Sequence, residues 1–155
     1  LTELGELLLA LDRDEEAQTQ FDVVEASLVL LVDGGVNVDL ESALYLADHG
    51  DGDAAREAAE TEWAARRSVH TADAVAWARF QAGDPEAALA PARKATSLGG
   101  HEARFWLHRG TIEAALGMDA QAVRHLRRGL SIDLGVSPWQ ADRARAVLRG
   151  LGVRP

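Results

Sequence analysis

The chain reads FQAGDPEAALAPARKA at residues 80–95 and AALGMDAQAVRHLRRG at residues 114–129, and these two stretches follow one pattern 34 residues apart. They share a glycine, an alanine five places later and then a basic pair: Gly83 and Gly117, Ala88 and Ala122, Arg93-Lys94 and Arg127-Arg128. In each copy the glycine separates two helix-like segments, so the repeated unit is a helix, a short turn and a second helix. A repeat of this kind predicts stacked helical hairpins.

Composition agrees with an all-α fold in a single domain. The chain has 155 residues, of which 47% are hydrophobic and 26% charged, within the usual range for globular proteins. Aromatic residues make up only 5% and proline is rare, whereas alanine, leucine and glutamate recur throughout. This composition favours helices over sheets.

Capping signals and apolar periodicity predict where the helices begin and end. Asp84 and Ser137 each precede a proline, and Asp119 follows a glycine closely, which are typical helix starts. Glycines such as Gly83 and Gly117 stand just after apolar-periodic segments, as helix stops do. We expect nine helices, at 2–11, 14–32, 39–49, 54–67, 71–82, 85–97, 102–116, 119–132 and 139–150. The short turns between them force neighbouring helices to fold back as antiparallel hairpins.

The period and the unit structure resemble the tetratricopeptide repeat (TPR) family in its bacterial form. The last unit matches best, through Trp106, Gly110, Gly117, Ala122, Leu126 and Gly129, with Glu113 in place of the family's aromatic residue. The third unit matches through Ala76, Gly83, Ala88, Ala92 and Ala95, with Phe80 one place beyond the aromatic position. The first unit matches through Leu4, Gly5, Ala17, Phe21 and Val24, and the second, shifted by one residue, through Gly50, Ala55 and Ala59.

The resemblance implies a right-handed superhelical solenoid of about four TPR-like hairpins plus a C-terminal capping helix. Its units would be residues 1–33, 36–68, 69–100 and 101–134, with the capping helix at 138–150, in one domain over 1–155. Small residues where two helices cross let the backbones approach, and large residues one turn away fill the remaining groove. The stretch VDGGVNVDLE at 32–41 is expected to be a loop that lengthens the first connection.

In arrays of this family the first helix of each unit lines a concave surface suited to an extended or helical peptide. The corresponding positions here are Asp73, Trp77, Gln81, Arg104, Leu107 and Thr111. Trp77 fits the hydrophobic core equally well, and both interpretations stay open. Some relatives clamp a peptide's two carboxylates with several basic residues, but Arg104 is the single basic residue among these positions, so that specificity is not inferred.

Charge is divided unevenly along the chain. Residues 1–62 hold 17 acidic and 2 basic residues, whereas residues 63–155 hold 8 acidic and 14 basic ones. The overall net charge of −9 argues against nucleic acid as a partner, since phosphate binding needs a basic surface. A basic stripe at Arg93, Lys94, Arg124, Arg127 and Arg128 predicts a solvated convex face, with an RNA or phosphate site as the alternative.

Motifs that would carry catalysis or bind a metal fail on spacing. The chain has no P-loop, no dinucleotide-type glycine triplet, no serine elbow and no cysteine. His101-Glu102 begins like a zinc-protease motif, but Phe105 stands where the second histidine is needed. Asp48, Asp51 and Asp53 resemble a calcium loop that lacks further oxygen ligands, so we expect a turn in which Asp53 caps the next helix. The five histidines, at 49, 70, 101, 108 and 125, are expected to be structural or solvated.

The most apolar window, VVEASLVLLV at 23–32, is too short to span a membrane and predicts a buried helix. Because the chain opens at Leu1 without methionine, we expect it to be part of a longer protein of undetermined compartment.

We therefore expect a non-enzymatic module that binds a protein or peptide in its groove, with no cofactor, no metal and no nucleic acid. The alternative is a structural role in which copies associate weakly end to end, the acidic half of one against the basic half of the next. In that case the N-terminal hairpin would supply apolar surface that includes Leu8.

Overall fold

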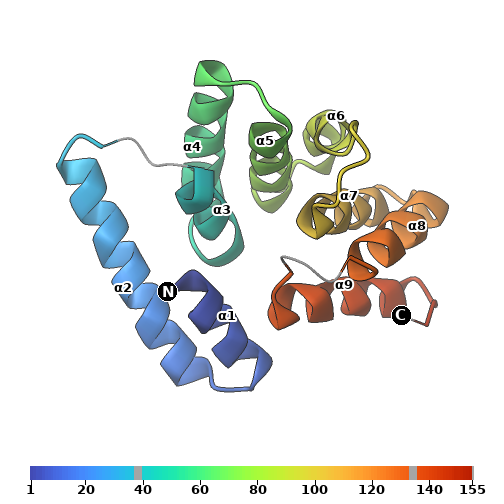
Figure 1. Ribbon diagram of the computed structural model, residues 1–155, viewed down its shortest axis with the longest axis horizontal. Coiled ribbons are helices and arrows are strands. Elements are labelled where there is room, and N and C mark those ends of the chain that lie inside the picture. The colour runs from blue at the N-terminus through green and yellow to red at the C-terminus, as the bar shows by residue number, and fades with distance from the viewer. Residues whose placement is uncertain (37–39, 133–135, 155) are drawn as a thin grey trace.

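The computed structural model describes residues 1–36, 40–132 and 136–154, and it is helical throughout this part of the chain (Figure 1). Its helices are α1 (Thr2–Ala10), α2 (Asp14–Asp33), α3 (Leu40–His49), α4 (Gly52–Ala65), α5 (Val69–Gln81), α6 (Pro85–Ala95), α7 (Ala103–Ala115), α8 (Asp119–Leu130) and α9 (Pro138–Gly150). The all-α prediction is confirmed for the described residues, among which no strand occurs. The expected helices are present, with ends that differ by a few residues.

Consecutive helices pack as pairs: α1 with α2, α3 with α4, α5 with α6, and α7 with α8. The pairs are joined because α4 also packs on α5, and α6 on α7. Helix α9 contacts α8 and α7 and also reaches α1 at the other end of the chain (Figure 1). The last helix therefore returns across the inner side of the molecule to the first one.

The turns at Gly83 and Gly117 have the same backbone geometry. Both glycines are left-handed, with φ of 87° and 70°, a conformation that side chains other than glycine disfavour. The N–H of Asp84 donates to Arg79 O at 3.0 Å, and the N–H of Met118 donates to Glu113 O at 2.9 Å. These bonds close the preceding helix in the same way in both copies of the repeated stretch.

Two of the expected caps are present, and two are corrected. The side chains of Asp84 and Ser137 accept the N–H groups of Ala87 and Gln140, as predicted. Helix α4 is capped by Asp51 and not by Asp53, because α4 begins two residues earlier than predicted and places Asp53 within its first turn. Met118, directly after Gly117, stands at the N-cap of α8 as Asp84 does after Gly83, so Asp119 is the first helical residue and not the cap.

Small residues lie where the paired helices cross. Ala88 and Ala122 are completely buried. A Cβ added to Gly110 would lie 2.6 Å from Leu126 Cγ and 3.0 Å from its backbone nitrogen. Helices α7 and α8 therefore approach so closely that this position has no room for a side chain.

Most of the second half of α2 is exposed, with Val24 and Leu28 half-buried, so the prediction of a buried helix at 23–32 is wrong. Phe21, in the first half, packs against Tyr45 of α3 with ring centroids 5.9 Å apart. Every residue from Val29 to Val36 is exposed, and Leu30 reaches 72%. The reason is length, because α2 extends beyond α1 and α3 and no described residue covers its end. Leu8, expected at the surface, is buried between α1 and α2.

The loop expected at 32–41 lies partly outside the described residues, which end at Val36 and resume at Leu40. Across the described chain, no helix has the length and apolar character needed to cross a membrane.

Candidate binding pocket beneath the last helix

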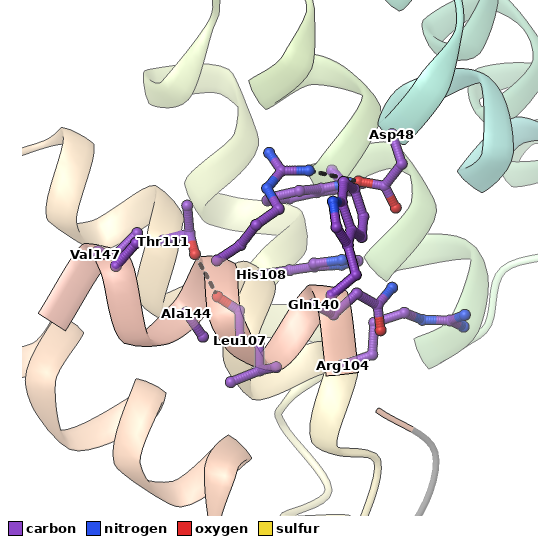
Figure 2. Close-up of a pocket in the computed structure, with 12 residues that line it drawn as sticks. Asp48, Arg104, Leu107, His108, Thr111, Gln140, Ala144 and Val147 are labelled. Atoms are coloured by element: carbon purple, nitrogen blue, oxygen red, sulfur yellow. Dashed lines mark hydrogen bonds and ion pairs between the residues drawn. The ribbon is translucent and has the colours of Figure 1, made fainter. Parts of the chain in front are cut away.

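A pocket of about 210 Å³ lies between the inner faces of α5 and α7 and helix α9 (Figure 2). One wall is formed by Trp77, Leu107, His108 and Thr111. The opposite wall is formed by Trp139, Gln140, Arg143 and Val147. Asp48 of α3 lies at one end, so the pocket draws side chains from four helices.

The structure places four of the six predicted groove residues around this pocket: Trp77, Arg104, Leu107 and Thr111. Asp73 is fully buried beneath it, and Gln81, at the end of α5, does not line it. Trp77 belongs to both the core and the pocket wall, since it is 4% exposed and still faces the cavity. The capping helix, expected at the end of the stack, instead lies over these residues.

Trp77 is held from two sides. Its Nε1–H donates to Asp48 Oδ1 at 2.9 Å. The ring of His108 stacks on the indole in parallel, with centroids 4.0 Å apart. Asp48 on α3, Trp77 on α5 and His108 on α7 therefore form one connected group, which we call the central cluster.

Asp73 positions His108 from below. His108 Nδ1 lies 3.0 and 3.1 Å from the two carboxylate oxygens of Asp73. Arg104 Nε is 3.4 Å from the same carboxylate. A buried aspartate is costly unless it is paired, and these two neighbours supply the pairing. The sequence carries one signal that could have predicted this pair, because Asp73 and His108 lie about one repeat apart, on α5 and α7.

Arg143 of α9 contacts the central cluster from above. Its Nη1 lies 3.4 Å from Asp48 Oδ1, and its guanidinium lies 5.9 Å from the ring centroid of Trp77. The guanidinium also covers Trp139, at 4.6 Å. The Arg143 side chain is 43% exposed, so it reaches the cluster from solvent.

A second pocket, of about 420 Å³, adjoins the first and shares Asp48, Arg104 and Gln140 with it. Its lining adds three glutamates, Glu3, Glu6 and Glu41. This end of the inner surface is therefore mainly acidic, and its field favours cations.

Helices α1 and α3 contact each other beside this second pocket, which we call the acidic pocket. His49 Nε2 lies 3.3 Å from Glu6 Oε1, and the His49 ring stacks on Phe21 at 4.3 Å. Trp139 of α9 joins them, 4.7 Å from His49. Burial raises the pKa of Tyr45 to about 12, so this phenol stays neutral and donates to Phe21 O. The contacts link the first two hairpins to α9.

Glu113, which stands where the resemblance noted in the sequence expects an aromatic residue, is fully buried. His125 Nδ1 lies 2.6 Å from its Oε2, and Arg109 Nε donates to its Oε1 at 2.9 Å. Burial lowers the pKa of His125 and outweighs the opposite effect of Glu113. This network joins α7 to α8 away from the pocket. Sequence reasoning left the partners of His49, His108 and His125 unassigned.

The other candidate sites are dispersed. Asp48 faces the pocket, whereas Asp51 caps α4 and Asp53 pairs with Arg56, and no group of metal-ligating residues forms within the described parts of the chain. In the basic stripe, Arg127 and Arg128 donate to the carbonyls of Arg154 and Gly99. Part of the basic stripe is therefore hydrogen-bonded to the protein's own backbone.

No family model matches the chain. No curated protein matches it, and no solved structure does.

Proposed function

We propose that the chain is a non-enzymatic, TPR-like binding module that holds a helix or peptide of a partner protein in the groove between α5, α7 and α9. The observation that carries the proposal is the pocket, which gathers four of the residues at groove positions of successive repeats. A concave, mostly apolar surface with a few fixed polar groups is the usual form of a binding site.

The repeat geometry supports the finer part of the proposal, a right-handed superhelical array of TPR-like hairpins. Gly83 and Gly117 make the same turn at equivalent positions, and Ala88 and Ala122 are buried at equivalent crossings. A chain that repeats its turns and its crossings stacks its hairpins with a constant rotation, which produces a curved inner wall.

Photo-crosslinking from the full chain tests where the partner binds. A photo-reactive residue in place of Thr111 is expected to form an adduct with a partner polypeptide. The matched control is the same residue in place of Arg124, which is exposed on α8 away from the pocket and is expected to form none. An adduct from Arg124 but not from Thr111 would overturn the groove as the binding surface.

The exposed end of α2 favours a second candidate function, self-association. Val29 to Val36 form an uncovered apolar segment on the acidic half of the chain. A second copy offers the basic half, and this charge complementarity favours contact between unlike ends. Exposed ion pairs contribute only about 0–1 kcal/mol each, so burial of the apolar segment has to supply most of the affinity.

Sedimentation at low and high salt tests self-association. We expect concentration-dependent association at low salt that weakens as salt screens the charges. Leu30→Glu should abolish it, because Leu30 is 72% exposed and belongs to the segment. Leu8 is unsuitable for this test because it is buried and its substitution reports on folding. A monomer at all concentrations in low salt would exclude this candidate.

A further inference from the structure

Helix α9 lies on the groove as a helical ligand would. Trp139, Arg143 and Val147 are spaced by four residues and all line the pocket. This spacing aligns side chains on one side of a helix, which is how an amphipathic helix enters a groove. Part of the proposed binding surface is therefore covered by a segment of the same chain.

Arg143 of α9 lies beside a carboxylate, that of Asp48, which other contacts already hold in place. The Asp48 side chain is 7% exposed, and its Oδ1 accepts from Trp77 and faces Arg143. His108 stacks on Trp77 and keeps the indole fixed. A fixed carboxylate beside an aromatic ring is suited to a guanidinium, which forms ion pairs and packs on ring faces.

Arg143 makes only long contacts with Asp48 and Trp77. Its distance of 3.4 Å to Asp48 is long for a charge-assisted hydrogen bond, and 5.9 Å to Trp77 is near the limit of a cation–π contact. The firm attachment of α9 lies further along, where Ala144 and Leu148 are buried with Leu107. The buried residues of α9 are thus in its second half, whereas its first half contacts the groove through partly exposed side chains.

The acidic pocket, like the central cluster, favours a positively charged ligand. It begins at Asp48 and continues through Glu3, Glu6 and Glu41 beside the first turn of α9. Its lining also includes Arg104, but that side chain lies beside the Asp73 carboxylate, so the four carboxylates still outnumber the basic groups. A helix that replaced the first half of α9 would meet negative charge along its path.

We infer that the central cluster of Asp48, Trp77 and His108 recognises an arginine on a basic amphipathic helix of a partner protein, and that Arg143 of α9 occupies this place as an internal competitor. The inference rests on the proposed function and names its ligand. The partner helix carries an aromatic residue one turn before the arginine, as Trp139 precedes Arg143.

A labelled peptide that copies residues 136–154 serves as the probe, and the full chain is the receptor. Weakening the internal competitor should expose the groove to the probe. We expect Arg143→Ala in the chain to tighten probe binding by about fivefold, because the partly exposed contacts that it removes are individually modest.

The matched control is Arg145→Ala. Arg145 is 45% exposed, close to the 43% of Arg143, but it pairs with Asp142 and does not line the pocket. Probe binding to this variant should equal binding to the parent chain. Equal tightening by both substitutions would show a general loosening of α9 and would overturn the inference.

Asp48→Asn in the Arg143→Ala chain tests the receptor side. The asparagine keeps an oxygen for Trp77 but loses the charge, so we expect the gained affinity to disappear while circular dichroism stays unchanged. A probe carrying alanine in place of its own arginine should bind as weakly. If the probe binds no variant, or binds regardless of Asp48, the inference fails. The crosslinking result at Thr111 is independent of this outcome, so the proposed function would then stand or fall separately.

Discussion

The hairpins α1–α2 and α7–α8 are built by the same local rules and end in different environments. In both, a glycine lies where the helices cross: a Cβ on Gly5 would lie 2.3 Å from Phe21, and one on Gly110 would lie 2.6 Å from Leu126. The α7–α8 hairpin is covered by α6 on one side and α9 on the other. The first hairpin leaves the end of α2 uncovered. Local sequence therefore determines the hairpin, whereas its neighbours determine which of its apolar residues are buried.

The largest expected effect contrasts a leucine of each hairpin. Leu126→Ala should lower the free energy of unfolding by about 2–5 kcal/mol, because Leu126 is fully buried and its loss leaves a cavity. Leu30→Ala, at 72% exposure, should change it by no more than about 0.5 kcal/mol. Chemical denaturation measures both values. A large cost for Leu30→Ala would mean that the end of α2 is covered in solution.

A smaller effect is expected where the helices of each hairpin cross. Ala17, Ala88 and Ala122 are completely buried at corresponding places of three hairpins. Leucine at any of them should overpack the crossing and cost about 1–3 kcal/mol. Denaturant midpoints of the three variants compare the hairpins directly. If Ala17→Leu alone were harmless, the first crossing would be looser than the other two.

The pH dependence of stability should distinguish the α7–α8 hairpin. His125 has a folded-state pKa below its ordinary value of 6.5, so its contribution to stability is present above about pH 6.5 and is lost as the pH falls through the folded value. The groups facing the ring are Glu113, Arg109, Arg124 and Trp106.

His125→Gln, which does not titrate, should reduce the loss of unfolding free energy between about pH 7 and pH 5. His101→Gln, at an exposed position outside the helices, is the control and should leave the pH dependence unchanged. An unchanged slope in His125→Gln would show that the ring is not the group that titrates.

Much of the fold could be predicted from the sequence because its signals are local. Asp84, Gly83 and Gly117 act through their own turns, and these turns form as expected. The exposure of α2 and the return of α9 could not be predicted, because both depend on which surfaces distant helices offer each other. Ser68, whose capping box with Thr71 starts α5 two residues early, was a local signal that was missed.

The candidate site divides in the same way. Trp77, Leu107 and Thr111 could be placed on one wall because the repeat fixes their positions. Asp48 and Arg143, 95 residues apart, could not be paired, because their contact exists only where α9 crosses the groove. The pairing of Asp73 with His108 could have been predicted, since their separation of 35 residues nearly equals the length of the repeat.

Amide hydrogen exchange of the full chain tests the central claim most directly. It is measured with and without the partner protein that crosslinking at position Thr111 identifies. The account predicts slower exchange in α5 and α7 and altered exchange in the first half of α9 when the partner is bound, with residues 29–36 unchanged. Protection confined to residues 29–36, with α5, α7 and α9 unaffected, would contradict it and would move the working surface to the end of α2.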